Sequence, residues 1–311
     1  MHARTPKHFV LEERLERYAD FIEPAPQDYA GRWAEACFPV GSTALEKGAA
    51  QPRRFREVRL DLGCGKGAFT VESARCEPDV LFLGMDGEPL CMAYAGGIAA
   101  KSGLENVVFL AWDGHRVTEA FAPGELSRIY LNFPTPFPRK RQARLRLTDA
   151  TYLMDYRRIL APSGALRLKT DSRPLYLFTL EELAAAGYEV LWTSEDARAD
   201  FPNEPTSGYE ERLAANGAKV FALEAAPGPE PPHFSPTPQR GLVEYLPQDL
   251  EKLDYVPLGM EATVWNMRNR EAKLWAKGHR DEKRANNSEK CAALHEQGGD
   301  PVGSLSRELT P

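Results

Sequence analysis

The fold of this chain is decided at residues 61–69, which read Asp61-Leu62-Gly63-Cys64-Gly65-Lys66-Gly67-Ala68-Phe69. An apolar run typical of a strand precedes the glycines at 58–62, and a helical pattern follows them at 68–75. A glycine turn between a strand and a helix is the context of a nucleotide-binding loop. The alternative reading of the same residues is a tight turn that binds nothing.

The spacing of these glycines distinguishes between classes of ligand. A dinucleotide site has the pattern G-x-G-x-x-G, whereas this chain has G-x-G-x-G directly behind Asp61. A carboxylate at that point repels a pyrophosphate and attracts a cation. S-adenosylmethionine carries a sulfonium and an amino group, so we expect it to be the cofactor.

Strands and helices alternate through the central part of the chain. The predicted strands are 58–62, 80–84, 107–111, 128–133, 165–170, 188–192 and 219–225, and the predicted helices are 68–75, 89–101, 149–159 and 171–186. Thr148 is the expected N-cap of the third of these helices. The alternation predicts an α/β fold, with a seven-stranded and mostly parallel sheet covered by helices on both faces. Ligands of such sheets bind at the carboxyl ends of the strands.

Composition divides the chain into three parts. Residues 1–54 read as an N-terminal arm and lead-in, and residues 55–226 as the alternating domain. Residues 227–311 read as a proline-rich linker, a short helix and a disordered tail, because six prolines fall between Pro227 and Pro238 and the end of the chain is polar.

The cysteines and the hydropathy indicate where the protein works. Five cysteines with no C-x-x-C pair favour reduced thiols in a cytoplasm and predict neither disulfides nor a metal site. The N-terminal residues lack the apolar core of a signal peptide, and no run reaches membrane-spanning length. We therefore expect a cytoplasmic protein with no membrane partner. The sequence leaves the oligomeric state open and is compatible with a monomer.

Acidic residues end two further strands at the same predicted edge. Asp86 follows the second strand, where a carboxylate can accept hydrogen bonds from both ribose hydroxyls of a nucleoside. Asp113 follows the third, where it could accept the adenine amino group. A lone aspartate at the end of a strand is more often a helix cap, but acids on three consecutive strands favour a binding edge.

A proline-rich loop with a basic tail follows the fourth strand. It reads Asn132-Phe133-Pro134-Thr135-Pro136-Phe137-Pro138-Arg139-Lys140-Arg141, and its prolines stop both strand and helix. The chain carries a formal charge of -6, yet residues 128–146 contain six basic residues and no acidic one. This local contrast predicts a polyanion-binding edge, against the alternative of an ordinary solvated helix start.

Two more motifs concern the substrate. Asp171 ends the fifth strand, where it could cap the next helix or accept hydrogen bonds from N1–H and the exocyclic amine of guanine. Thr206-Ser207-Gly208-Tyr209-Glu210 precedes the last strand, and Ser207 and Glu210 could close over a base or ribose. A tyrosine-rich loop that packs on the core is the alternative.

Taken together, these blocks resemble the bacterial tRNA (guanine-N7)-methyltransferase family over roughly residues 1 to 225. The matching blocks are Arg4-Thr5-Pro6-Lys7, the glycine turn, the proline loop with its basic tail, Thr170-Asp171 and Tyr209-Glu210. The resemblance implies a Rossmann-like class I methyltransferase fold. It also implies that the chain uses S-adenosylmethionine to make 7-methylguanosine in tRNA.

The resemblance also assigns roles to residues. The cofactor contacts it implies are Asp61, Gly63, Gly65, Gly67, Asp86, Asp113, Asn132 and Thr135. The substrate contacts are Arg139, Asp171, Ser207, Gly208, Tyr209 and Glu210, and the catalytic positions are Asp171 and Thr135.

The chain departs from the family pattern at five positions. Thr135 replaces an aspartate of the proline loop, Phe137 a common tryptophan, Ser207-Gly208 a Thr-Glu pair, and Ala111 a common asparagine. Three hypotheses follow: an active tRNA methyltransferase, a tRNA-binding protein of this fold that has lost turnover, and a methyltransferase with another substrate. Asp171 and Arg139 favour the first, Thr135 and Gly208 the second, and the acidic overall charge the third.

Overall fold

The computed structural model describes residues 9–35, 37–38, 51–52, 55–250, 253, 255–257, 259–270, 272–274, 277 and 280–282. The chain divides into two compact units, Met1–Glu261 and Ala262–Pro311. The expected N-terminal motif at residues 4–7 and most of the expected disordered tail lie outside the described residues. In the described part, no helix is both long enough and apolar enough to cross a membrane.

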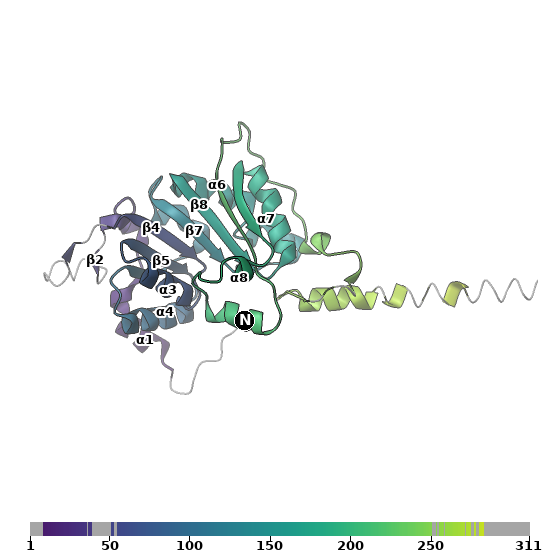
Figure 1. Cartoon of the computed structure of the whole chain (residues 1–311), viewed down its shortest axis with the longest axis horizontal. Helices are drawn as coiled ribbons and strands as arrows, with labels where there is room; N and C mark the ends of the chain where they lie inside the picture. The colour runs from purple at the N-terminus through teal and green to yellow at the C-terminus, as the bar shows by residue number, and fades with distance from the viewer. Residues whose placement is uncertain are drawn as a thin grey trace, which may run out of the picture. The chain divides into compact units, whose positions relative to one another are not determined.

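One twisted sheet forms the centre of the first unit (Figure 1). All seven predicted strands are present, as β4 (Glu57–Leu62), β5 (Val80–Asp86), β6 (Val107–Ala111), β7 (Leu126–Asn132), β8 (Leu160–Thr170), β9 (Tyr188–Ser194) and β10 (Phe221–Pro227). An eighth strand, β1 (Ile22–Glu23), pairs in parallel with β6 at the edge. Two residues are too few to produce a strand periodicity, so the sequence pattern could not reveal β1.

The strand order is β1-β6-β5-β4-β7-β8-β10-β9. The neighbours from β1 through to β8 run parallel, whereas β10 is antiparallel to both β8 and β9. The order reverses between β4 and β7, which places a switch point at the carboxyl ends of these two strands. In open α/β sheets, ligands bind at such a point. A separate two-stranded sheet joins β2 (Cys37–Phe38) and β3 (Gln51–Pro52).

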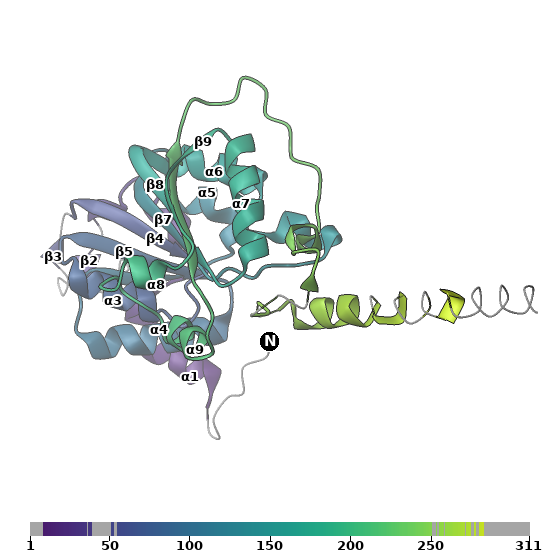
Figure 2. The same ribbon diagram turned by 45° about the vertical axis from the view of Figure 1, so that its right-hand side comes forward.

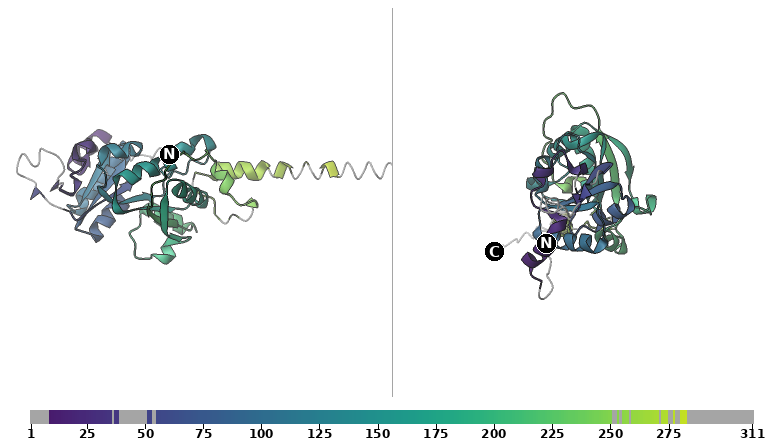
Figure 3. Two further views of the ribbon diagram at one scale, coloured as in Figure 1. Left: turned by 90° about the horizontal axis from the view of Figure 1, so that it is seen from above. Right: turned by 90° about the vertical axis from the view of Figure 1, so that its left-hand side faces the viewer.

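Helices cover both faces of the main sheet (Figures 1 and 3). The helices are α1 (Leu11–Arg17), α3 (Ala68–Cys76), α4 (Pro89–Ser102), α5 (Val117–Ala120), α6 (Ala150–Ile159), α7 (Arg173–Ala185), α8 (Ala197–Asp200) and α9 (Gly208–Ala215). Short 3-10 turns are η1 (Ala19–Phe21), η2 (Pro26–Tyr29), η3 (Trp33–Glu35), η4 (Gly114–Arg116), η5 (Lys140–Leu145) and η6 (Leu242–Tyr245).

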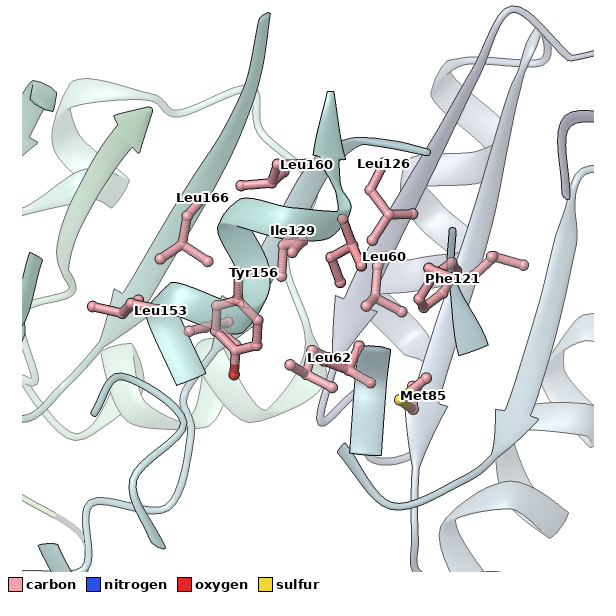
Figure 4. Packing of buried hydrophobic residues seen from close by; sticks show 14 of the residues in the cluster. Leu60, Leu62, Met85, Phe121, Leu126, Ile129, Leu153, Tyr156, Leu160 and Leu166 are labelled. Atoms are coloured by element: carbon pink, nitrogen blue, oxygen red, sulfur yellow. The ribbon is translucent and has the colours of Figure 1, made fainter. Parts of the chain in front are cut away.

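Two apolar layers hold these helices on the sheet. On one face, Leu60 and Ile129 pack with Leu153 and Tyr156 of α6 (Figure 4). On the other face, Phe82 and Phe109 pack with Phe69, Met92 and other residues of α3 and α4. Because both faces are covered, the central strands are apolar along nearly their whole length, as expected for a parallel sheet.

One helix cap lies one residue beyond the expected position, and a second excludes one of the two readings of Asp171. Asp149, not Thr148, caps α6, because its carboxylate accepts the amide hydrogen of Thr151 at 3.0 Å. Ser172, not Asp171, caps α7 through a hydrogen bond from the Leu175 amide. The side chain of Asp171 is therefore not the N-cap of this helix.

The first unit extends to Glu261, beyond the predicted domain boundary at 226. Leu242, Leu250 and Met260 are fully buried, and η6 packs beside α7 (Figure 2). We call residues 234–261 the C-terminal strap. The prolines between 227 and 238 predict a linker from composition alone. In the structure, the residues that follow these prolines are packed on the first unit.

Candidate active site

The glycine turn after β4 has the backbone that its sequence predicted. Gly63, Gly65 and Gly67 all have positive φ, at 78°, 54° and 76°. A Cβ at Gly67 would lie 2.4 Å from the ring of Phe109, so α3 can approach the sheet only over a glycine. The turn is thus closely packed against the sheet at Gly67, whereas Gly65 has open space where a Cβ would lie.

Asp61 lies buried directly under this turn. Its carboxylate accepts hydrogen bonds from Thr70 Oγ1 at 2.6 Å and from Asn132 Nδ2 at 3.1 Å. Burial raises the pKa of Asp61 to about 6, although the two hydrogen bonds act in the opposite direction. A nearby cation would stabilise the ionised form of a carboxylate in this position.

Asp86 and Asp113 lie at the ends of the two neighbouring strands. Asp86 accepts the amides of Gly65 at 3.0 Å and Glu88 at 2.9 Å, so its carboxylate ties the glycine turn to the next loop. Asp113 accepts the amide of His115, and this bond is the first cause that holds its pKa below the usual value. Asp113 caps η4 and still faces the open edge.

A cavity of about 160 Å³ opens at this edge of the sheet. Four of the expected cofactor residues line it: Gly63, Asp86, Asp113 and Thr135. The remaining walls are Leu62, Met85, Gly87, Gly114, His115, Phe137, Leu145 and Leu147. The other four, Asp61, Gly65, Gly67 and Asn132, do not line the cavity. Asp61 and Asn132 are joined to each other by a hydrogen bond. Apolar side chains with a few acids at one rim suit a nucleoside that carries a cationic group.

The proline loop forms one wall of the cavity through Thr135 and Phe137. Phe133 and Phe137 have positive φ, 52° and 44°, which is rare for aromatic residues and costs on the order of 1–3 kcal/mol each. The backbone is held there because the Phe133 amide donates to the Lys169 carbonyl at 2.7 Å and Arg146 binds the Phe137 carbonyl. Such strain in a well-supported loop is typical of functional sites.

The six basic residues of the predicted polyanion edge separate into two groups. Arg139, Lys140 and Arg141 are exposed. The other three have structural partners: Arg128 pairs with Glu224, Arg144 with Asp149, and Arg146 is fully buried. The expected edge is therefore narrower than the run of charges suggested, since half of the cations hold the fold together.

Asp171 lies at the end of β8 with 6% of its surface exposed. Its Oδ2 accepts a hydrogen bond from the hydroxyl of Tyr255 at 2.8 Å. Burial, and after it the negative charge of Asp171, raise the pKa of Tyr209 to about 12. The ring of Tyr209 contacts Phe133 edge-on at 5.3 Å. The structure thus brings together Asp171, Tyr209 and the proline loop.

The remaining predicted substrate residues divide between two environments. Ser207 caps α9 by accepting the Glu210 amide, and Gly208 is exposed with no atom near its missing Cβ. Glu210 is buried and faces Lys169, which also pairs with Glu204 at 3.0 Å. Glu210 therefore takes part in packing α9 onto the sheet, as in the alternative reading of this motif.

Sequence reasoning missed Tyr255 and Arg146 as parts of this region. Arg146 belongs to a basic run that reads as surface, and only its contact with three backbone carbonyls reveals its role. Tyr255 lies 84 positions from Asp171 in a segment of low regularity, so no local pattern could connect the two. In the described part of the chain, no group of three or more His, Cys, Asp or Glu side chains could hold a metal ion.

The chain is similar to known proteins over most of the domain that contains this site. A family model described as "Putative methyltransferase" matches residues 56–223, more than half of the chain. The chain is 32% identical over 216 residues to a protein named tRNA (guanine-N(7)-)-methyltransferase from Lactococcus lactis subsp. cremoris, covering 68% of this chain and 93% of that protein. It is 33% identical over 219 residues to the protein of the same name from Geobacillus kaustophilus, covering 70% and 94%.

Among solved structures, the chain resembles the 16S rRNA methyltransferase KamB at 19% identity and a TM-score of 0.45, covering 56% of this chain and 89% of that one. The matches to the two bacterial proteins span 216 and 219 residues. The family model ends at residue 223, before the C-terminal strap begins.

Proposed function

Because the chain belongs to the tRNA (guanine-N7)-methyltransferase family, we propose that it transfers a methyl group from S-adenosylmethionine to N7 of a guanine in tRNA. The observation that carries the proposal is the pairing of two regions at one edge of the sheet. The cavity beside the glycine turn has the acids and apolar walls for the cofactor. Asp171 stands at the end of β8 for the base, and Tyr209 of α9 contacts Phe133 of the proline loop.

The residues around the glycine turn fit S-adenosylmethionine. Asp86 and Asp113 line the cavity as hydrogen-bond acceptors for ribose and adenine. Asp61, Asn132, Gly65 and Gly67 support this side from below. When bound, the cofactor supplies an electrophilic methyl group on a positively charged sulfur. Asp61 contributes negative charge beneath the turn, and Thr135 contributes one hydroxyl to the opposite wall.

The protein needs no general base for this reaction. Guanine N7 has a free lone pair and loses no proton, so positioning and a matched electrostatic environment are sufficient. Asp171 accepts the N1–H and the exocyclic amine, which orients N7, while Tyr209 and Phe133 offer aromatic surface beside the base. The role of Asp171 is therefore to place the nucleophile, and Thr135 in place of an acid leaves the reaction possible.

The substrate side also needs to hold the tRNA backbone. Arg139, Lys140 and Arg141 are exposed at the end of the proline loop and can bind phosphates. Gly208 leaves open space at the start of α9. Ser207 caps this helix by accepting the amide hydrogen of Glu210. We infer a cytoplasmic location, which the tRNA substrate and the free thiols of Cys64, Cys76 and Cys91 support.

The test is methyl transfer by the full-length protein. Purified protein is incubated with methyl-labelled S-adenosylmethionine and tRNA transcribed without modifications, and the digested nucleosides are separated. We expect label in 7-methylguanosine. Label in another nucleoside would redirect the substrate assignment. No label despite measured binding of both tRNA and cofactor would favour a tRNA-binding protein without turnover.

A further inference from the structure

The C-terminal strap ends on the substrate side of the site, although it lies outside the matched family region. Tyr255 Oη donates to Asp171 Oδ2 at 2.8 Å. Met260 is fully buried, and its sulfur accepts a hydrogen bond from the Ser172 hydroxyl at 3.7 Å. A Cβ on Gly259 would lie 3.5 Å from the ring of Pro136 in the proline loop. Three strap residues thus reach both loops that surround the proposed guanine site.

This end of the strap is held in place by anchors upstream. The Arg146 guanidinium donates to the Arg240 carbonyl at 3.0 Å, and the Leu242 amide donates to the Pro138 carbonyl at 2.9 Å. Thr237 donates to Glu182 at 2.6 Å. These anchors join the start of the strap to α7 and to the proline loop, and the buried Leu250 and Met260 lie on either side of Tyr255, so its contact belongs to a packed segment.

We propose that Tyr255 is a positioning residue for Asp171, which makes the strap a part of the guanine site; this inference rests on the proposed function. A carboxylate can rotate about its terminal torsion, and a donor on one oxygen fixes that rotation. A carboxylate offers about four acceptor sites, and the hydrogen bond from Tyr255 uses one of them. Tyr255 thereby holds Asp171 in the orientation that guanine requires.

A restraining role is the competing possibility, because a side chain bound to a substrate residue can also occupy the substrate's place. The two roles predict opposite changes in rate. If Tyr255 positions Asp171, losing its hydroxyl slows methyl transfer. If Tyr255 blocks Asp171, the same loss speeds it.

The experiment compares full-length Tyr255→Phe with full-length Tyr245→Phe. Tyr245 lies in the same strap, and its hydroxyl donates to the carboxylate of Glu181 at 2.7 Å, so it is a matched tyrosine–carboxylate control in an exposed position. We expect Tyr255→Phe to lower kcat for unmodified tRNA about tenfold. The KM for tRNA, the affinity for S-adenosylmethionine and the Tm should change little, and Tyr245→Phe should behave as wild type.

Combining the variant with Asp171→Asn separates positioning from a general effect on structure. If Tyr255 acts through Asp171, adding Tyr255→Phe to Asp171→Asn should lower kcat by less than twofold, since the two effects are coupled. Fully additive losses, an unchanged rate in Tyr255→Phe or a faster rate would each overturn the inference. A wild-type protein that makes no 7-methylguanosine would instead overturn the proposed function, and this inference with it.

Discussion

The two sides of the candidate site are built in different ways. On the cofactor side, the glycine turn, Asp86 and Asp113 come from the ends of consecutive strands, and their hydrogen bonds join close neighbours in the sheet. On the substrate side, Asp171 meets Tyr255 of the strap, and Phe133 of the proline loop meets Tyr209 of α9. The cofactor side is thus specified by short motifs, whereas the substrate side depends on segments that are distant in sequence.

This difference teaches where variation can enter such an enzyme. A turn made of positive-φ glycines under a packed aromatic ring tolerates few changes. A site completed by an added segment can acquire new contacts without disturbing that turn. Of the departures from the family pattern, Thr135, Phe137, Ser207 and Gly208 lie in the proline loop and at the start of α9, whereas Ala111 ends β6 on the cofactor side.

Truncation gives the largest expected effect. Ending the chain after Ala226 removes Leu242, Leu250 and Met260 from the core, and burial of three such side chains stabilises a fold by on the order of 5 kcal/mol. We expect a strongly lowered Tm or no cooperative unfolding in a calorimetric scan. A chain that ends after Glu261 keeps the whole first unit and serves as the control. Equal melting of the two would show that the strap does not stabilise the domain.

Asp171→Asn should have the next largest effect, on rate. Asparagine presents a donor where guanine also donates, and such a buried mismatch costs about 1–3 kcal/mol, or roughly tenfold to a hundredfold in kcat. Affinity for S-adenosylmethionine should stay unchanged, because Asp171 lies on the other side of the site. The exposed Asp79 supplies the control variant Asp79→Asn. Near-normal turnover of Asp171→Asn would remove this residue from the guanine site.

Neutralising Arg139, Lys140 and Arg141 to glutamine should weaken tRNA binding by about tenfold at physiological salt. The dependence of log affinity on log salt should also become shallower, by about one for each phosphate that the loop no longer binds. The control neutralises Arg56, Arg75 and Lys101, which are exposed at the start of β4 and the ends of α3 and α4, at the opposite edge of the sheet. If both triple variants bind tRNA equally weakly, the basic loop is not the tRNA-binding edge.

Binding of the cofactor should depend on pH through Asp61. Its pKa is raised to about 6, and a cation nearby favours the ionised form, so affinity for S-adenosylmethionine should rise several-fold from pH 5 to 7 and then level off. The same raised pKa means that the contribution of Asp61 to folding is present below about pH 4 and is lost as pH rises through 6. Calorimetric titrations of wild type and Asp61→Asn across this range provide the measurement. If the affinity of the wild type for S-adenosylmethionine changes with pH as little as that of the variant, ionisation of Asp61 does not affect cofactor binding.

Thr135→Asp should give the smallest change. The reaction needs no base, and the prolines fix the loop, so we expect kcat within about threefold of wild type in either direction. Single-turnover rates with saturating cofactor measure this effect directly. A much faster variant would show that the reaction uses a negative charge at position 135, which threonine does not supply.

The sequence could predict the sheet and the glycine turn because both depend on local patterns. Strand periodicity located β4 to β10, and the spacing of Gly63, Gly65 and Gly67 predicted the turn that the structure contains. It could not locate β1, whose two residues carry no periodicity. The cap at Asp149 lies one residue beyond the expected Thr148, because adjacent side chains can make the same bond and only backbone geometry selects between them.

The substrate side was less predictable because its contacts span the chain. The pattern predicted a substrate role for Asp171 but gave no sign of its hydrogen bond with Tyr255, and it grouped the buried Arg146 with the exposed Arg139. Composition likewise predicted a linker from the prolines between 227 and 238 and gave no sign that Leu242, just beyond them, is buried in the domain. Long-range packing of this kind leaves no periodic signal in a single sequence.

The way Arg146 is bound has a consequence for how the strap can diverge among related chains. Its guanidinium contacts the carbonyl oxygens of Pro136, Phe137 and Arg240, and it lies over the ring of Phe178. Carbonyl oxygens are present whatever the side chain, so a substitution at position 240 leaves this bond to Arg146 in place while it removes the ion pair between Arg240 and Glu181. The bond depends on which residue the connection brings to this point and not on that residue's side chain.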